Sequence, residues 1–525
     1  MRILFVFILL YVYVFNSMIF YSEYQNNLYN FRMTIKSIVK SKYVYINAIY
    51  YVIITILTVI TANFHAKTLI YGVIYMLMCC LYTLIIKANM IHFDIVFTRK
   101  MSRLFIINLA VYLCFVLPSF FIYNSYYLIY FMFACYIVLQ WIFIAMSLAI
   151  NYPIDKYIES KYIKLAKDKL LRLPDLKIIA ITGTYGKTSV KEILYTLLSV
   201  KYNVVKSPGN YNTTFGITKT ILEYVKKDTD ILILEMGANV VGDIKKLCEI
   251  AHPHYGILVS IGLQHLASFG SIENIIKTKS ELSDFIDKNN GVMVFNYAND
   301  YIKNIADSYK GEKVLCGDVD ASQSLCYAKN ILCDINGTTF DFVLDHETVT
   351  NIHVPVLGSK SVENIVCAIS MACVVGLNLE DIKIGLKNIK IVGARLEKIM
   401  LPKGAILINN GYNSNIDSCQ MSFEVLSYNV DKIKVVVTPG LIELGHMQYD
   451  INYKFGEKIA RVADRVAIIK QENRQAILDG LLSLDFNKEH IMYFDTYMEC
   501  YEKYIKNLDS NYVVLVENDL PKYYK

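Results

Sequence analysis

One short stretch of the chain, KIIAITGTYGKTSVKEIL from residue 177, combines residue types that can hold a phosphate. Glycines allow a tight turn, helix-start N–H groups and the helix dipole favour an anion, a lysine adds charge, and a hydroxyl can reach Mg²⁺. The residues concerned are Gly183, Gly186, Lys187 and Thr188. The usual G-x-x-x-x-G-K-[ST] spacing is not met, because Ile181 stands at its first glycine. Nucleotide binding is favoured, with a helix-capping turn as the alternative.

Polar side chains also stand at the ends of two later apolar segments. Glu235 ends the run DILILE, and His265 follows the run YGILVSIG, before a helical pattern that carries Lys277 and Lys279. A single strand-end glutamate is usually a solvated cap, and a single histidine is usually structural. Because ligands of open α/β sheets bind at the carboxyl ends of the strands, these two segments, together with the phosphate loop before them, favour a phosphate and metal site.

The elements that must position these residues alternate between strand and helix patterns. Residues 176–390 predict a doubly wound α/β domain with an inserted β-rich patch at 338–358. Residues 391–525 repeat the alternation, with strands AILINN, KVVVTPG, RVAIIK and YVVLVEN, and predict a smaller Rossmann-like domain. We expect a hinge at 393–395 and a linker at 151–175, with ligands bound in the cleft that the hinge closes.

Composition divides the chain into two regions. The whole is 54% hydrophobic with mean hydropathy +0.35, yet 19% of its residues are charged, which predicts an apolar region joined to a globular one. A net charge of +6, spread along the chain, does not indicate nucleic-acid binding. The 12 cysteines form no C-x-x-C pair, so neither a disulfide framework nor a zinc site is indicated.

The apolar region, residues 1–150, predicts about five transmembrane helices of bilayer length. The expected spans are roughly 3–21, 43–64, 68–86, 104–122 and 128–150. The connections after the first and third spans are basic, and by the positive-inside rule they face the cytoplasm. The N-terminus is then outside, and everything after Ile150 is cytoplasmic. A cleaved signal peptide is the rival interpretation of residues 1–21, but no small-residue cleavage site follows. The spans act as an anchor or as a dock for a lipid-linked substrate.

From residue 176 onward the chain resembles the Mur ligase family. The segments GTYGKTS, SPGNYNTTFGITKTIL, EMGANVVGDI, SIGLQHLASFGSIENIIKTKSEL, GARLEKI, NNGYNSNIDS and VTPGLIELG occur in the family's order. They look most like the MurF type, UDP-N-acetylmuramoyl-tripeptide:D-alanyl-D-alanine ligase, in a membrane-anchored variant. The resemblance implies a central P-loop ATPase domain and a C-terminal Rossmann-like domain.

The resemblance also assigns site residues. Those implied for ATP are Gly183, Thr184, Gly186, Lys187, Thr188, Ser189, Asn364, Arg395 and Asn410. Those implied for two Mg²⁺ ions are Thr188, Glu235, His265 and Lys279, the last as a carbamylated lysine. Catalysis is assigned to Lys187, Glu235, His265, Lys279 and Arg395, and substrate binding to Asn210, Asn212 and Thr213. Carbamylation turns a cation into an anionic oxygen ligand, which a hard divalent ion prefers.

Three features depart from the family pattern. Lys360 and Ser361 replace the usual His-Asn pair, and Asn409 and Asn410 stand where two aspartates are usual. Ile416 replaces a proline. The predicted spans occupy the place of the small domain that recognises the UDP-sugar in soluble relatives.

The function implied is ATP-dependent amide bond formation through an acyl phosphate. The expected partners are a UDP-linked muramoyl tripeptide, D-alanyl-D-alanine, the cell membrane and other proteins of cell-wall synthesis, without nucleic acid. One alternative keeps the ligase chemistry on another substrate, such as a poly-γ-glutamate type polymer. A second alternative is a degenerate nucleotide-binding membrane sensor, suggested by the two asparagines.

Overall fold

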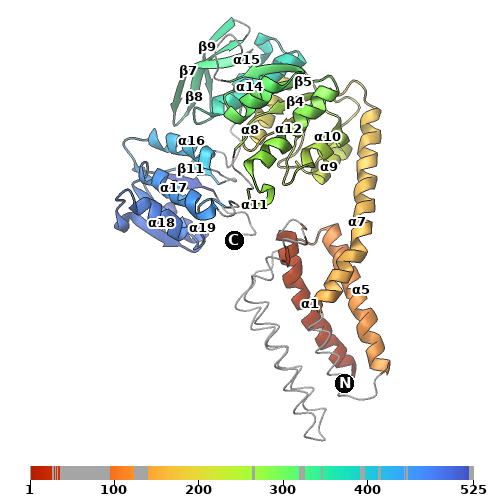
Figure 1. Ribbon diagram of the computed structural model, residues 1–525. Helices are drawn as coiled ribbons and strands as arrows, with labels where there is room; N and C mark the ends of the chain where they lie inside the picture. The colour runs from red at the N-terminus through yellow and green to blue at the C-terminus, as the bar shows by residue number, and fades with distance from the viewer. Residues whose placement is uncertain are drawn as a thin grey trace. The chain divides into compact units, whose positions relative to one another are not determined.

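The computed structural model describes most of the chain (Figure 1). The described residues are 2–26, 29, 31, 34–35, 95–122, 140–262, 266–317, 326–344, 347–390, 396–411, 416–442, 444 and 447–518. They form two compact units, Met1–Lys161 and Tyr162–Lys525, and each is described by itself.

The first unit is helical and has a core of aromatic and polar side chains. Its described helices are α1 (Arg2–Asn26), α5 (Arg99–Ile122) and the first part of α7 (Gln140–Leu171). The ring of Tyr13 on α1 stacks on that of Tyr112 on α5, with centroids 3.6 Å apart. Asn108 Oδ1 accepts hydrogen bonds from the Tyr13 hydroxyl at 2.7 Å and from Ser147 Oγ at 3.1 Å, so a buried amide links the three helices.

The five predicted spans are only partly within the described residues. The spans at 3–21 and 104–122 fall inside α1 and α5, and residues 140–150 of the last span begin α7. The spans at 43–64 and 68–86 lie outside the described residues. Among the helices that the structure describes, none has the length and apolarity needed to cross a membrane. The predicted transmembrane region therefore finds no support in this part of the chain.

The central domain of the second unit is built on a nine-stranded sheet, in the order β2-β3-β1-β4-β5-β6-β7-β8-β9. The strands are β1 (Lys177–Thr182), β2 (Val204–Lys206), β3 (Ile231–Glu235), β4 (Tyr255–Leu258), β5 (Val292–Asn296), β6 (Glu312–Cys316), β7 (Cys326–Asp334), β8 (Gly337–Leu344) and β9 (Glu347–Val354). The first six strands, β1 to β6, pair in parallel. Strands β7, β8 and β9 extend the sheet as antiparallel pairs. The predicted β-rich insertion is thus present, and it begins earlier, at β7.

Helices cover both faces of this sheet (Figure 1). One face packs α8 (Lys187–Leu198), α14 (Ser361–Val375) and α15 (Leu379–Lys387), and the other packs α9 (Thr214–Tyr224), α10 (Asp243–Ala251), α12 (Ile272–Lys288) and α13 (Asp300–Ser308). A single turn, α11 (Leu266–Phe269), precedes α12. Strand β1 is buried on both sides, since Ile179 and Ile181 join one core and Ile178 and Ala180 join the other. This alternation explains why β1 is a continuous apolar run.

The C-terminal domain is a second α/β layer structure with a six-stranded sheet, in the order β10-β11-β15-β12-β13-β14. Its strands are β10 (Glu397–Met400), β11 (Ile406–Asn410), β12 (Ile433–Thr438), β13 (Arg465–Ile469), β14 (Ile491–Phe494) and β15 (Tyr512–Glu517). Its helices are α16 (Ile416–Ser427), α17 (Gln448–Ala460), α18 (Arg474–Leu482) and α19 (Tyr497–Lys503), with 3₁₀ turns η2 (Lys488–His490) and η3 (Ile505–Asn507). All pairs are parallel except β10 with β11. The predicted hinge at 393–395 lies outside the described residues.

Candidate active site

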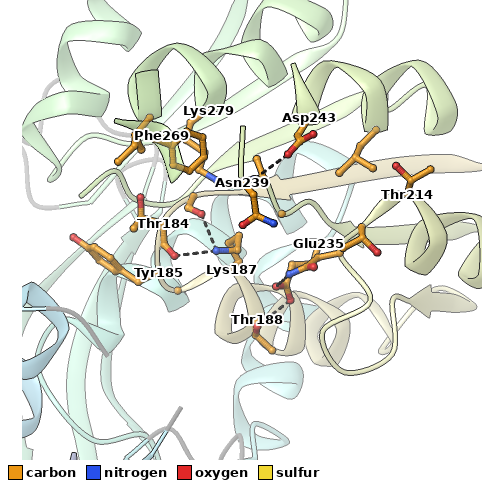
Figure 2. A pocket seen from close by; sticks show the side chains of 18 residues that line it. Thr184, Tyr185, Lys187, Thr188, Thr214, Glu235, Asn239, Asp243, Phe269 and Lys279 are labelled. Atoms are coloured by element: carbon orange, nitrogen blue, oxygen red, sulfur yellow. Dashed lines mark hydrogen bonds between the residues drawn. The ribbon is translucent and has the colours of Figure 1, made fainter. Parts of the chain in front are cut away.

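A cavity of about 310 Å³ opens at the carboxyl ends of β1 and β3, where the sequence predicts a ligand site (Figure 2). Its lining residues come from the turns after β1, β2 and β3, from the first turns of α8, α9 and α10, and from α11 and α12. They are Gly183, Thr184, Tyr185, Gly186, Lys187, Thr188, Asn212, Thr213, Thr214, Glu235, Gly237, Ala238, Asn239, Asp243, Leu247, Phe269, Ile275 and Lys279. The phosphate loop therefore shares one cavity with two of the candidates further along the chain, Glu235 and Lys279.

The turn between β1 and α8 needs glycine at two positions. Gly183 and Gly186 have φ of 155° and 79°, and Gly186 is the N-cap of α8. A Cβ at Gly183 would lie 2.9 Å from the Ser260 nitrogen, and one at Gly186 would lie 2.5 Å from Asn364 Oδ1. The loop therefore packs closely against the residues that follow β4 and against Asn364 of α14, and the N-terminus of α8 lines the cavity. This geometry is that of an anion-binding turn.

Lys187 places a cation directly on this loop. Its Nζ donates to the carbonyl oxygens of Gly183 at 2.8 Å and Thr184 at 2.9 Å, and both hydrogen bonds appear in Figure 2. The ammonium group therefore lies at the edge of the cavity, where a phosphate seated on the loop would meet it.

Glu235 ends β3 with its carboxylate almost fully buried, 2% exposed, and hydrogen-bonded on both oxygens. Oε2 accepts from Thr188 Oγ1 at 2.9 Å and from Lys191 Nζ at 3.3 Å, and Oε1 accepts from Asn212 Nδ2 at 3.2 Å. Burial by itself would raise the pKa of Glu235. The charges of Lys187 and Lys191 and the two neutral hydrogen bonds outweigh burial, so the pKa is lowered and the carboxylate is ionised.

Lys279 on α12 reaches the opposite side of the cavity with a side chain that is 4% exposed. Burial, reinforced by the charge of Lys187, lowers its pKa to about 7 against the partial compensation of Asp243, Glu281 and Glu235. A substantial fraction of this amine is consequently neutral at neutral pH, which is the form that can act as a nucleophile.

The loop after β3 is fixed by an acidic side chain that the sequence prediction missed. Asp243 Oδ2 accepts the backbone N–H groups of Asn239 at 2.9 Å and Val240 at 3.0 Å. Asn239 and Asp243 both line the cavity. The available signal was Asp243 itself, an acidic residue in the first turn of α10 after a glycine-containing loop.

Lys191 was also missed, although it contacts Glu235. Its position four residues after Lys187 puts both lysines on one face of α8, and that periodicity was the signal available. A lysine is seldom fully buried without a partner, so a sequence pattern alone favours an exposed side chain there.

The predicted residues are brought together only in part. Of the predicted residues, the cavity is lined by Gly183, Thr184, Gly186, Lys187, Thr188, Asn212, Thr213, Glu235 and Lys279. Asn364 lies next to the phosphate loop at Gly186. Ser189 and Asn210 are described but do not line the cavity. Asn410 lies at the end of β11 in the other sheet, whereas His265 and Arg395 lie outside the described residues.

The donor set suits a magnesium nucleotide. The Thr188 hydroxyl and a Glu235 carboxylate oxygen are 2.9 Å apart, and both are hard oxygen ligands. Within the described part of the chain, no group of three or more His, Cys, Asp or Glu side chains could hold a metal ion. Mg²⁺ is commonly bound by one or two protein oxygens together with substrate phosphates, and the Thr188–Glu235 pair fits that arrangement.

Comparison with known proteins agrees with this chemistry. Residues 181–372 match the Mur ligase middle domain. The chain is 29% identical over 307 residues to the UDP-N-acetylmuramoyl-tripeptide--D-alanyl-D-alanine ligase of Escherichia coli (strain K12), covering 58% of this chain and 67% of that protein. It is also 29% identical over 311 residues to the ligase of the same name from Bacillus subtilis (strain 168), and the match covers 57% of this chain and 63% of that protein. The chain therefore spans about two thirds of these relatives' length.

Solved structures give the same picture for the fold. MurF from Acinetobacter baumannii superposes with a TM-score of 0.61 at 25% identity, covering 69% of this chain and 78% of that chain. MurF ligase from Thermotoga maritima in complex with ADP gives a TM-score of 0.61 at 25% identity, with 69% and 80% covered. The two α/β domains described above have the mixed α/β Mur-ligase fold of these structures.

Proposed function

We propose that this chain is an ATP-dependent, ADP-forming ligase of peptidoglycan precursor synthesis, and the match of residues 181–372 to the Mur ligase middle domain supports this proposal. It joins D-alanyl-D-alanine to a UDP-N-acetylmuramoyl tripeptide, the reaction named for the relatives from Escherichia coli and Bacillus subtilis. The observation that carries the proposal is the convergence on one cavity of the Lys187 loop, the ionised Glu235 and the buried amine of Lys279.

The reaction proceeds in two steps that both build negative charge. The carboxylate of the tripeptide attacks the γ-phosphorus of ATP, which breaks the bond to the β-phosphate oxygen and gives an acyl phosphate and ADP. The amine of the dipeptide then attacks the acyl carbon, phosphate leaves, and the amine loses a proton. Lys187 and the N–H groups at the start of α8 stabilise the charge that develops on the transferred phosphoryl group.

The chain's own residues also define where magnesium is held. Thr188 and Glu235 would hold one Mg²⁺, which would supply neutralisation of phosphate charge. Lys279 becomes a carbamate: its neutral amine adds to carbon dioxide, a C–N bond forms and one proton is released. The pKa of about 7 supports this step, because a fully protonated amine could not add. By the family resemblance, His265 and the carbamate would hold a second Mg²⁺, and Arg395 would bind ATP.

The domain organisation and location are part of the same proposal. Residues 1–150 are a multi-pass region of the cell membrane, 151–175 a linker, 176–390 the ATP-binding domain and 391–525 the C-terminal domain. The catalytic domains are cytoplasmic, where ATP and UDP-linked precursors are found. Other proteins of cell-wall synthesis are candidate partners of the membrane region.

The test is ADP release and product formation by the purified full-length chain. With Mg²⁺, ATP, UDP-N-acetylmuramoyl tripeptide and D-alanyl-D-alanine, we expect ADP and a UDP-linked pentapeptide in equal amounts, identified by mass spectrometry. Omitting the tripeptide should abolish turnover. Replacing D-alanyl-D-alanine with glutamate distinguishes the polymer-type alternative. Nucleotide binding without turnover on any of these substrates would instead support a sensor and overturn the proposal.

A further inference from the structure

Lys191 is a fully buried lysine, 0% exposed, that bridges two parts of the site. Its Nζ donates to Glu235 Oε2 at 3.3 Å and to the carbonyl oxygen of Gly209 at 2.5 Å. Glu192, the next residue on α8, adds a carboxylate oxygen 3.8 Å from the same ammonium group. A buried ammonium is costly unless it is paired, so these contacts hold Lys191 in one position.

Gly209 belongs to the segment between β2 and α9, residues 207–213, which we call the acceptor loop. Glu235 also forms a hydrogen bond with a residue near each end of this loop. The backbone N–H of Glu235 donates to Ser207 Oγ at 3.2 Å, and Asn212 Nδ2 donates to Glu235 Oε1 at 3.2 Å. Gly237, two residues later, donates its N–H to the Asn212 carbonyl at 2.9 Å. The acceptor loop is therefore attached to the end of β3 at its two ends by Glu235 and in its middle by Lys191.

The same carboxylate is shared with the phosphate side of the cavity. Thr188 Oγ1 donates to the oxygen that Lys191 also contacts, Glu235 Oε2. A cation drawn to Thr188 and Glu235 meets the positive charge of Lys191 at close range, and in a buried site such charges repel strongly. Glu235 is thus linked to Asn212 by a direct hydrogen bond and to Gly209 through Lys191, which contacts both.

We infer that Lys191 is a positioning residue that makes the conformation of the acceptor loop depend on what Glu235 binds. Binding of the magnesium nucleotide would then change the acceptor loop, where the carboxylate substrate of the proposed reaction would bind. The inference rests on the proposed function for the identity of that substrate. It does not rest on it for the coupling, which needs only nucleotide, Mg²⁺ and the chain itself.

Hydrogen exchange in the full-length protein measures the coupling without turnover. With ADP present, adding Mg²⁺ should change amide exchange at residues 207–213 in the natural chain. In Lys191→Met, exchange of these amides should be about tenfold faster, because a hydrogen bond from a charged donor is lost, and it should no longer respond to Mg²⁺. Binding of Mg²⁺·ADP, followed by calorimetry, should be retained or tightened, since the opposing charge is gone. In steady-state kinetics, KM for the carboxylate substrate should rise while KM for ATP stays nearly constant.

Lys177→Met is the matched control. Lys177 begins β1, at the other end of the strand from the loop, and its Nζ also donates to a backbone carbonyl, that of Val375, at 3.2 Å. This variant should keep the response of residues 207–213 to Mg²⁺. If Lys191→Met does not fold, Lys191→Arg keeps the buried charge but replaces the compact ammonium with a larger, planar guanidinium that cannot take the same position between Gly209 and Glu235, and it should weaken the same response.

Three outcomes would overturn the inference. The natural chain could bind Mg²⁺·ADP with no change at residues 207–213. Lys191→Met could respond as the natural chain does. Lys191→Met could also raise both KM values equally with a lowered melting temperature, which is the signature of a structural role alone. Failure of the natural chain to bind nucleotide would overturn the proposed function together with the inference, whereas binding without ligation would leave the coupling measurable.

Discussion

Asn410 and Glu517 end two neighbouring strands, β11 and β15, and are direct partners in the register of the second sheet. Asn410 Nδ2 donates to both carboxylate oxygens of Glu517 at 3.0 Å, and the Glu517 side chain is fully buried. Cys419 on α16 donates its thiol to Glu517 Oε1 at 3.2 Å. An amide next to a buried carboxylate can donate, whereas a second carboxylate could not. This pairing explains why an asparagine suits position 410 in this chain.

Asn410→Asp, which introduces the residue usual in Mur ligases, should therefore be harmful here. It places two carboxylates about 3 Å apart in a buried site, and we expect a loss of about 3 kcal/mol in the free energy of unfolding at neutral pH. Adding Glu517→Gln should restore most of that loss, because one carboxylate and one amide are again opposed. Urea unfolding of the two single variants and the double variant measures the coupling. Additive effects would show that Glu517 does not determine what residue 410 can be.

Lys187→Ala should abolish ATP turnover and leave the fold intact. The substitution removes the cation that lies against the Gly183 and Thr184 carbonyl groups and that, in the proposed reaction, stabilises the transferred phosphate. We expect a loss of turnover of about a hundredfold or more, in line with removal of one preorganised electrostatic group. ADP release measures the loss, and thermal unfolding checks the fold. The exposed Lys227→Ala is the control, and normal ADP release by Lys187→Ala would refute the phosphate-loop assignment.

The lowered pKa of Lys279 predicts that activity decreases on the acidic side of its pH profile. Burial and Lys187 lower its pKa to about 7, while Asp243, Glu281 and Glu235 oppose the shift. The amine is neutral above about pH 7 and can become the carbamate, so activity should fall as pH drops through 7, and added bicarbonate should move that decrease to lower pH. Because the folded pKa lies below the unfolded value, this group also costs stability as pH falls from about 10 toward 7.

Substitution of Lys279 separates the carbamate from a plain lysine. Lys279→Ala should lose activity that bicarbonate cannot restore, and short carboxylic acids should restore part of it by supplying an oxygen ligand. Lys277→Ala, two residues away on α12, is the control and should behave as the natural chain does. Unchanged activity in Lys279→Ala would show that no carbamate is needed at this position.

The sequence also predicts the orientation of the chain in a membrane. Four basic residues in each of the connections 22–42 and 87–103 favour a cytoplasmic catalytic region. Protease added to intact cells should therefore leave residues 151–525 uncut, and the same protease should cut them after the cells are lysed. The control is a periplasmic or surface protein that is digested in the intact cells. Digestion of 151–525 from outside, or its release with the soluble fraction, would contradict the orientation or the membrane location.

Truncation tests how much of α7 the second unit needs. Ala166, near the end of α7, is buried in the same core as β1 and α12, with Ile163 and Leu170 beside it. A fragment of residues 151–525 keeps these side chains and should unfold cooperatively, with ligase activity at a raised KM for the tripeptide. A fragment beginning at Lys177 uncovers that core and should unfold at a clearly lower temperature. Equal melting temperatures for the two fragments would show that α7 is dispensable for the fold.

The sequence by itself determined those features that depend on neighbouring residues. The β-branched run before Gly183 predicted a buried strand, and the Gly-x-x-Gly-Lys-Thr turn that follows it predicted N–H groups, an ammonium and a hydroxyl at one point. Two α/β domains followed from the alternation of strand and helix patterns, because that period is set locally. The strand-end position of Glu235 was predictable for the same reason.

The tertiary structure alone decided which distant groups share an environment. Lys191 is fully buried because Gly209 and Glu235, 18 and 44 residues further along the chain, meet at its ammonium group. The lowered pKa of Lys279 arises from burial under side chains of other elements, and desolvation is not a property of any short segment. Asn410 and Glu517 lie 107 residues apart in sequence and become partners only when β11 and β15 pair in parallel. Local sequence sets backbone conformation, whereas charge, burial and hydrogen-bond partners depend on what long-range packing brings within a few ångströms.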